Sequence, residues 1–396
     1  MEAGSLCTQG RRRAGAPCGT QRWGYRLMDM PAPTRRRRPL LIEAERIIRS
    51  SFKPLQRYLD DPGTTEIMVN DPESVFVEDT HGMRKLEGVV LPENTMETVI
   101  RAILRMNDKE LAPTMDARLD GFRIAAALPP VAVHGPLLVI RKHSRRVFTL
   151  DGYVRDGGFT PLPEGEGGFQ GDDAATQRAA ESGAAGGGEG VADFFRWAVR
   201  ARKNILIVGA TTSGKTSFAS CLLREIPASD RIITCEDTHE LRLEQPNVVQ
   251  FEGLPDNDPA KAITIRSLIR LCLRCRPDHI VVGELRGPEA YDFLDALNTG
   301  HSGSICTLHA NNALLGLRRL ESLLRMSPNA STLPLRDMRT QIVSAVQYVV
   351  FQSRAGGIRG PEQILALDGI NDATGDYRTR LIFTRVHPAQ EATHHA

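Results

Sequence analysis

The sequence predicts an α/β protein in which a larger domain with a mostly parallel sheet follows a smaller α+β domain. From Ala192 onward, strand-like apolar runs alternate with helical ones, the pattern that gives a parallel sheet covered by helices. Earlier in the chain, short strand-like runs are separated by turn signals. With 396 residues, 41% of them hydrophobic, the chain is long enough to bury two cores without disulfides or metal ions.

The smaller domain is predicted to begin with an amphipathic helix from Leu40 to about Leu59, and a second helix is expected from Thr95 to Met106. Turn signals such as Asp61-Pro62-Gly63 separate short strands. The expected strands are Glu66–Asn70, Ser74–Glu78, Met83–Leu86, Phe122–Ala127 and Leu137–Lys142.

In the larger domain, five apolar runs predict the strands of the sheet: Asn204–Gly209, Arg231–Cys235, His279–Gly283, Ser304–Leu308 and Tyr348–Gln352. Pro288 suits a first helical turn and Gly300 suits a helix end, so a helix is expected over Glu289–Thr299. Two later runs, Glu362–Ile370 and Leu381–Val386, either close the sheet or form a peripheral hairpin.

Residues 151–190 are rich in Gly, Ala, Asp and Glu and have almost no apolar periodicity, so they are predicted to be a flexible linker. Four regions follow from this boundary. They are a disordered, Arg-rich extension over 1–39, the α+β domain over 40–150, the linker over 151–190 and the larger α/β domain over 191–396.

The charge is distributed unevenly along the chain. Residues 1–39 carry nine arginines against Glu2 and Asp29, whereas the remainder has a net charge of about −5. An acidic body argues against direct binding of nucleic acid. The arginines fit a basic arm that binds anionic lipid or nucleic acid. The alternative is a disordered extension, or an upstream start that precedes Met28 or Met30, and the Gly, Pro and Arg content favours this alternative.

The seven cysteines form no pattern of a secreted disulfide framework, which indicates a reducing cytoplasm. Cys272 and Cys275 are interpreted as helix-packing residues, because no second Cys or His pair completes a zinc site. No run approaches the roughly 18 apolar residues that a membrane span requires. We therefore expect a cytoplasmic protein whose association with a membrane is at most peripheral.

The most specific motif is GATTSGKT, which has the G-x-x-x-x-G-K-T spacing of a P-loop between a buried-strand pattern and a helical one. Its backbone N–H groups are expected to bind the phosphates of ATP. Lys215 would reach the β and γ phosphates, and the Thr216 hydroxyl would hold Mg²⁺. The predicted nucleotide-binding residues are Gly209, Ala210, Thr211, Thr212, Ser213, Gly214, Lys215, Thr216 and Ser217.

Three carboxylates are predicted at the carboxyl edge of the sheet, where open α/β sheets bind ligands. Glu284 ends a strand in RPDHIVVGELRGPEA and is the leading candidate for the base that polarises water, directly or through Mg²⁺. Glu236 and Asp237 end another strand in RIITCEDTHEL and suit Mg²⁺ and water positioning. A helix N-cap formed by Asp237 or Thr238 is the alternative for this pair. The candidate magnesium ligands are Thr216, Glu236, Asp237 and Glu284.

Two histidines flank one short strand in NTGHSGSICTLHANNA. Either imidazole is able to donate a hydrogen bond to a γ-phosphate and so report its presence. A single histidine is more often structural, but the position of His309 at the end of the strand favours a catalytic role. His301 is a candidate for nucleotide binding.

The motifs GATTSGKT, CEDTHEL, RPDHIVVGELRGPEA and TGHSGSICTLHA resemble, in order and separation, those of the secretion and traffic ATPases of type II and type IV systems. The likeness is greatest to the TrbB-type conjugal transfer ATPases and extends from about Leu40 to Val386. It implies a RecA-like P-loop ATPase domain in a hexameric ring that hydrolyses MgATP to power pilus assembly or substrate passage. The implied partners are inner-membrane components of a secretion or conjugation complex, at the cytoplasmic face.

The resemblance also implies a role for individual residues. The four motifs correspond to Walker A (Lys215 and Thr216), the Asp box (Glu236 and Asp237), an atypical Walker B (Glu284) and the His box (His301 and His309). In the family, arginines of the N-terminal domain reach the phosphates. The segments RLDGFRIAAALPP and LLVIRK match them and nominate Arg123 and Arg141, with Arg118 as a weaker candidate.

Some features depart from the family pattern or leave alternatives open. The Gly-rich stretch around Gly171 to Gly190 is longer than such a linker requires, which leaves the interdomain geometry open. The N-terminal domain caps either the nucleotide of its own subunit or that of a neighbour. The absence of a tetracysteine insertion favours the type IV branch, with retraction motors of twitching pili as other relatives. A nucleotide-gated scaffold and a DNA-translocating motor are competing functions. The pair Glu236 and Glu284 argues against the first, and the acidic body argues against the second.

Overall fold

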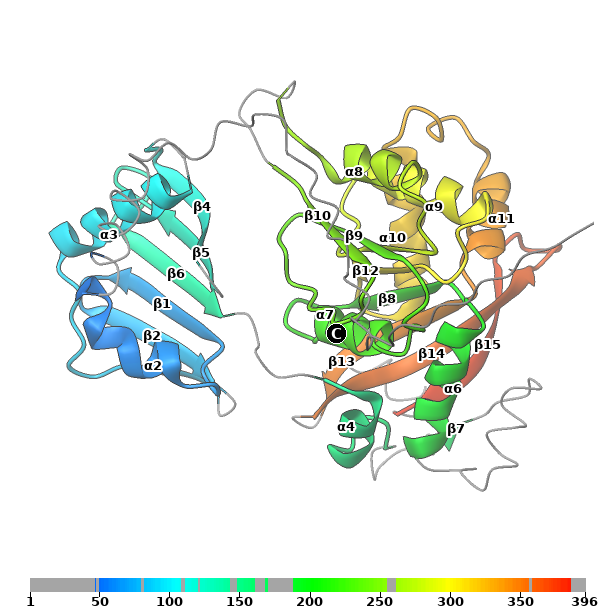
Figure 1. Ribbon diagram of the computed structural model, residues 1–396, viewed down its shortest axis with the longest axis horizontal. Helices are drawn as coiled ribbons and strands as arrows, with labels where there is room; N and C mark the ends of the chain where they lie inside the picture. Colours follow the sequence, from blue (N-terminus) through cyan, green and yellow to red (C-terminus); the bar gives the residue numbers. More distant parts are fainter. Residues whose placement is uncertain are drawn as a thin grey trace, which may run out of the picture. The chain divides into compact units, whose positions relative to one another are not determined.

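The chain divides into two compact units, Met1–Ser144 and Arg145–Ala396 (Figure 1). The computed structural model describes residues 47, 50–79, 82–107, 111–119, 122–142, 148–160, 168–169, 188–254, 261–355 and 358–385. The predicted N-terminal extension over 1–39 lies outside these residues. Each unit has its own hydrophobic core, so the two are described separately.

The first unit is a six-stranded antiparallel sheet with the strand order β3-β2-β1-β6-β5-β4. Helix α3 (Glu93–Met106) buries Met96, Ile100 and Ile103, residues spaced three and four apart, in the core of this unit. All five predicted strands and the second predicted helix match these elements; β4, whose sequence TMDARL has no apolar run, was not predicted. The strands are β1 (Glu66–Asp71), β2 (Ser74–Asp79), β3 (Gly82–Lys85), β4 (Thr114–Leu119), β5 (Phe122–Ala127) and β6 (Leu137–Lys142).

The predicted helix from Leu40 to Leu59 is interrupted. A 3-10 turn, η1 (Lys53–Leu55), precedes the short helix α2 (Gln56–Asp60). Pro54 supplies the reason, because its ring fixes φ and it has no N–H group to continue a helix. Residues 40–46 and 48–49 lie outside the described part of the chain.

The second unit contains a nine-stranded sheet with the order β10-β9-β11-β12-β8-β13-β14-β15-β7. The strands from β10 to β13 run parallel, and β14, β15 and β7 add antiparallel partners at one side. All five predicted strands are present, and the two later runs extend the sheet rather than forming a separate hairpin. The strands are β7 (Gly168–Phe169), β8 (Ile205–Gly209), β9 (Ile232–Glu236), β10 (Val248–Glu252), β11 (His279–Val282), β12 (Ile305–His309), β13 (Tyr348–Ala355), β14 (Ile358–Ile370) and β15 (Tyr377–Thr384).

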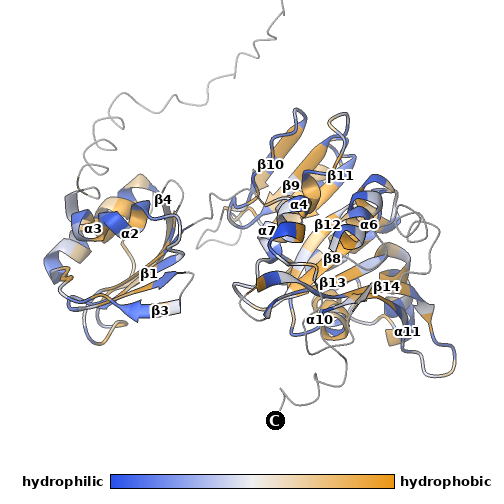
Figure 2. Cartoon of the chain, turned by 90° about the horizontal axis from the view of Figure 1, so that it is seen from below, coloured by the Kyte–Doolittle hydropathy of each residue, from blue (hydrophilic) through white to orange (hydrophobic). Residues whose placement is uncertain are grey.

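Helices cover both faces of this sheet, which is why its central strands are apolar throughout (Figure 2). Along β8, Leu206 and Val208 belong to one core and Ile205 and Ile207 to the other, as the two-residue period of a strand requires. The first core also takes residues from α8 (Ile265–Cys272), α9 (Glu289–Asn298), α10 (Ala313–Arg325) and α11 (Leu335–Ala345). The second takes residues from α4 (Leu150–Arg155), α6 (Gly188–Arg200) and α7 (Lys215–Leu223).

Side chains fix the starting points of three helices. Thr149, Thr264 and Asn312 are the N-caps of α4, α8 and α10, and each side-chain oxygen accepts a hydrogen bond from the backbone N–H three residues later. These bonds satisfy N–H groups that have no partner inside the helix. No described helix is long and apolar enough to cross a bilayer.

The linker predicted over residues 151–190 is wrong for residues 151–160 and for the start of α6. Phe159 is fully buried in the second unit, and its ring lies 6.1 Å from that of Phe195 and 6.4 Å from that of Phe218. Gly360 allows this packing, since a Cβ atom there would lie 2.1 Å from the Gly158 carbonyl oxygen. Phe159 thus anchors this Gly- and Asp-rich segment to the core of the second unit. Residues 161–167 and 170–187 lie outside the described residues.

We expect Phe159→Ala to destabilise the second unit by about 3–5 kcal/mol, because it removes a buried ring and leaves a cavity. Urea denaturation followed by the fluorescence of Trp197, which packs in the same core, measures the effect. Arg155→Ala, at an exposed position of α4, is the matched control and should change the stability by less than about 0.5 kcal/mol. An unchanged midpoint for Phe159→Ala would mean that this segment is a linker after all.

Candidate nucleotide-binding and catalytic site

The turn between β8 and α7 has the backbone shape that phosphate binding requires. Gly214 is left-handed, with φ +93°, and Thr212 also has a positive φ of 62°. A Cβ atom on Gly209 would lie 2.3 Å from the Gln352 carbonyl oxygen, so only glycine fits there. The first bond within α7 joins the Phe218 N–H to the Gly214 carbonyl (2.9 Å), which leaves the earlier N–H groups of the helix available to an anion.

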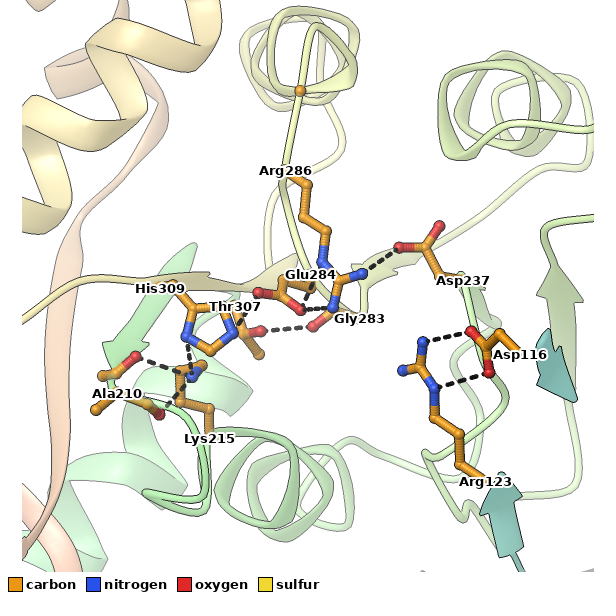
Figure 3. A network of polar contacts seen from close by, with 12 residues as sticks. Asp116, Arg123, Ala210, Lys215, Asp237, Gly283, Glu284, Arg286, Thr307 and His309 are labelled. Atoms are coloured by element: carbon orange, nitrogen blue, oxygen red, sulfur yellow. Dashed lines mark hydrogen bonds and ion pairs between the residues drawn. The ribbon is translucent and has the colours of Figure 1, made fainter. Parts of the chain in front are cut away.

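Lys215 is held inside this turn and is only 7% exposed. Its Nζ donates to the carbonyl oxygens of Gly209 (2.9 Å) and Ala210 (2.8 Å) and lies 3.1 Å from Nδ1 of His309 (Figure 3). Burial lowers the pKa of Lys215 from its ordinary value to about 8, because removal from water disfavours the charged form. The ammonium group therefore depends on these three acceptors for its stabilisation.

His309, at the end of β12, connects Lys215 to Glu284. An ammonium group only donates, so Nδ1 of His309 accepts from Lys215 and the ring proton lies on Nε2. Nε2 lies 2.7 Å from Oε1 of Glu284. Burial and the neighbouring Lys215 lower the pKa of His309, which keeps the imidazole neutral. The network thus contains one neutral ring between a cation and a carboxylate.

Glu284 follows β11 and is the centre of a second set of ionic contacts. Its Oε2 accepts from Nε (2.9 Å) and Nη2 of Arg286, and Arg286 Nη1 lies 3.4 Å from Asp237 (Figure 3). Oε1 is buried and accepts no hydrogen bond in good geometry, so it keeps an acceptor position. Such a carboxylate is suited to orient or deprotonate a water molecule.

A buried carboxylate fixes the loop that carries Arg286. Glu289, in the first turn of α9, accepts the backbone N–H groups of Arg286 and Gly287 through one oxygen, both at 2.7 Å. The Leu285 N–H donates to the Thr307 carbonyl of the neighbouring strand. Neither Arg286 nor Glu289 was singled out in the sequence. The signal was present in RGPE, where an acid at a helix start follows the loop that it secures.

Glu236 performs the same task for the loop after β9, which differs from the predicted role in binding Mg²⁺. Its side chain is 2% exposed, and Oε1 accepts the N–H groups of Glu240 and Leu241, both at 2.9 Å. The N-cap alternative is wrong, because the next described element is β10 and not a helix. Of the predicted pair, Asp237 contacts the network around Glu284, through Nη1 of Arg286.

The structure separates the two histidines. Nδ1 of His301 lies 3.1 Å from the carbonyl oxygen of Ala296 at the end of α9. His301 precedes β12, whereas His309 ends it, so the two stand at opposite edges of the sheet. The structure therefore gives His301 the structural role that a single histidine usually has, and it does not bring this residue to the P-loop.

Arg123 and Arg141 lie on the sheet of the first unit. They are directly opposite each other on β5 and β6, and Arg118 on β4 is opposite Arg123. Directly opposed residues share a face of a sheet, so the backbone register aligns three arginines across three strands. Arg123 pairs with Asp116 (2.9 Å) and Arg141 with Glu66 (3.2 Å). The arginines that were nominated from the sequence thus lie on neighbouring strands of one sheet.

The chain is similar in sequence to known proteins of bacterial secretion systems. A family model described as type II/IV secretion system protein matches residues 187–354, which include every described element from β8 to β12. The PtlH homologue of the type IV secretion system of Bordetella bronchiseptica is 35% identical over 313 residues, covering 77% of this chain and 90% of the relative. VirB11 of Brucella suis is 33% identical over 313 residues, covering 76% and 83% respectively.

A solved structure supports the fold independently. The ATPase DotB of Legionella pneumophila superimposes with a TM-score of 0.50 at 18% identity, covering 82% of this chain and 80% of that chain. At this identity the likeness concerns the fold alone.

The pKa of Lys215 predicts how nucleotide affinity depends on pH. Phosphates bind the ammonium form, and the free protein loses that proton as the pH rises through about 8. The dissociation constant for ADP should therefore be constant below pH 7 and increase above pH 8, by up to about tenfold per pH unit. Titration calorimetry between pH 6.5 and 9.5 measures this. Lys215→Arg, whose side chain stays charged, should flatten the dependence; an equally steep profile in that variant would assign it to another group.

The different environments of Glu236 and Asp237 predict effects of different size on the free energy of unfolding. Glu236→Ala leaves two backbone N–H groups without their acceptor and should lower the free energy of unfolding by about 1–3 kcal/mol. Asp237→Ala removes a side chain that is 45% exposed and should have a much smaller effect. Denaturant unfolding of both variants tests this. Equal stabilities would contradict the structural role of Glu236.

Proposed function

Because this chain belongs to the type II/IV secretion ATPase family, together with PtlH and VirB11, we propose that it hydrolyses MgATP at Lys215 to power a type IV secretion or conjugation machine. The observation that carries the proposal is the network of Lys215, His309 and Glu284 at the carboxyl edge of the parallel sheet. It joins a phosphate-binding cation to a carboxylate that has a free acceptor position.

The turn around Gly214 fits the phosphates of ATP, because its positive φ and the N–H groups of α7 form a cradle that a larger residue would fill. Among the described residues, no cluster of three His, Cys, Asp or Glu side chains could hold a metal by itself. Mg²⁺ would therefore bind together with the nucleotide, through the Thr216 hydroxyl and phosphate oxygens. When bound, it neutralises charge on those phosphates.

The next step is a change of partners for Lys215. Phosphate oxygens replace the Gly209 and Ala210 carbonyls around its ammonium group, since a charged acceptor binds more strongly than a neutral one. Glu284 then orients or deprotonates the attacking water through Oε1. Arg286 holds the other oxygen and so fixes the direction of the carboxylate.

The remaining roles complete the proposal. Arg123 and Arg141 stabilise the charge that develops on the transferred phosphate, from their own subunit or from a neighbour. The chain works as a hexameric ring on inner-membrane components of a secretion complex, at the cytoplasmic face, and hydrolysis drives rigid-body motion of its domains. The assignment to the TrbB-type conjugal branch rests on the four sequence motifs alone.

The first experiment is ATP hydrolysis by the purified full-length protein, with its oligomeric mass recorded in the same samples. Lys215→Ala should abolish phosphate binding, and Glu284→Gln should lower kcat at least about 100-fold while ADP still binds, since removal of a general base has an effect of that size. His301→Ala is the matched control and should retain turnover, because His301 contacts α9 and not the P-loop.

A competing function, a nucleotide-gated scaffold, predicts a different result. It would bind ATP and assemble with its partners but show no turnover in the unmodified protein. Turnover that persists in Lys215→Ala or in Glu284→Gln would refute the role given to that residue. Turnover by a monomer would contradict the ring.

A further inference from the structure

The nucleotide site has a second side that none of the residues discussed above occupies. β8, which carries the P-loop, lies between β12 on one side and β13 on the other (Figure 1). The parallel pairing of β13 with β8 ends at Phe351 and Val208, so Gln352 follows at the same edge as Gly209. The register of β13 with β14 shifts between Phe351 and Gln352, and irregularities of this kind redirect side chains next to functional sites.

Two side chains from the β13–β14 hairpin lie against Gly214 of the P-loop. A Cβ atom on this glycine would lie 3.5 Å from Cδ of Arg359 and 3.7 Å from Nε2 of Gln352. The preceding residue, Ser213, lies on the same side of the turn as the Gln352 backbone, because a Cβ atom on Gly209 would meet both the Ser213 Oγ (2.6 Å) and the Gln352 carbonyl oxygen (2.3 Å). Strands β13 and β14 thus contribute one residue each to the surroundings of the phosphate-binding turn.

Gln352 and Ser213 are buried and Arg359 is partly buried, and each has a buried polar atom without a hydrogen-bond partner. Gln352 is 0% exposed, and neither its Oε1 nor its Nε2 makes a hydrogen bond; the same holds for Oγ of Ser213 and Nε of Arg359. Buried polar atoms in native proteins are nearly always hydrogen-bonded, so three such residues around one glycine indicate a group that is still to bind. Among the described residues, Arg359 also has no carboxylate as an ion-pair partner.

The order of the strands indicates which part of a nucleotide reaches Arg359 and Gln352. Glu284 follows β11 and His309 ends β12, both on one side of β8, so the phosphate that is transferred lies there. The rest of the nucleotide then extends toward the other side, where β13 ends and β14 begins. A guanidinium group without a carboxylate partner is suited to bind phosphate, because it presents several N–H donors in a planar fork.

We propose that Arg359 binds the phosphates that ADP and ATP have in common, and that Gln352 secures Ser213 and the turn around Gly214 once these phosphates are bound. The proposal rests on the proposed function, because it requires a nucleotide at the P-loop. Arg359 is thereby a nucleotide-binding residue, and Gln352 is a positioning residue that acts through the P-loop.

Calorimetric binding of ADP and of a non-hydrolysable ATP analogue tests Arg359. Arg359→Gln should weaken both ligands by the same factor, about tenfold, and should raise KM for ATP with kcat changed less than about twofold. Arg378→Gln, at an exposed arginine of β15, is the matched control and should bind both ligands as the unmodified protein does. A loss confined to the ATP analogue, or no difference between the two variants, would overturn the proposal.

The role of Gln352 requires a different measurement, since a buried residue is expected to affect folding. Gln352→Leu removes an amide whose hydrogen bonds are unmade in the free protein, so the Tm without nucleotide should be unchanged or higher. The increase in Tm on adding saturating ADP should be smaller than in the unmodified protein. A lower Tm with an unchanged response to ADP would show that Gln352 is merely structural.

Lys215→Ala separates this proposal from the function on which it rests. If the unmodified protein binds ADP and Lys215→Ala does not, the P-loop function stands. The Arg359 and Gln352 variants alone then decide whether these two residues take part in nucleotide binding. If the unmodified protein binds no ADP, both proposals fail together.

Discussion

The burial of one ammonium group determines the arrangement of the whole site. Removal from water makes the charge of Lys215 costly, so it must be surrounded by acceptors, and the structure supplies two P-loop carbonyls and one ring nitrogen. Because Nδ1 of His309 accepts from Lys215, the ring proton is placed on Nε2, facing Glu284. Glu284 is in turn oriented by Arg286. Lys215 is thereby connected to the Glu284 carboxylate through the imidazole ring of His309.

Two loops at the edge of the sheet are each held by one buried carboxylate. A loop that leaves a parallel strand has backbone N–H groups without ladder partners, and they must be satisfied if the loop is to keep one shape. Glu236 satisfies two of them after β9, and Glu289 satisfies two of them after β11. Through one oxygen each, these carboxylates hold the loops in which Asp237 and Arg286 lie in positions where the two side chains meet.

The sequence predicted the features that local patterns determine and missed those that depend on packing. The P-loop and the strand ends carrying Glu284 and His309 could be located because spacing and apolar periodicity are local signals. The structural role of Glu236 could not, since a carboxylate at a strand end is the same in sequence whether it faces a ligand or its own loop. Phe159 was assigned to a linker because its partners Phe195 and Phe218 come from other segments. Gln352 gave no signal, because the contact with Gly209 exists only after β13 pairs with β8.

Charge balance explains why cations beyond Lys215 are needed. Before a nucleotide binds, Lys215 and Arg286 are opposed by Glu284 and Asp237, so the described network is close to neutral. The phosphates of ATP add several negative charges to a partly buried place, and Arg286 is already committed to carboxylates. Arg359 has no carboxylate to exchange among the described residues, which makes it the cation of the second unit that is ready to meet this charge.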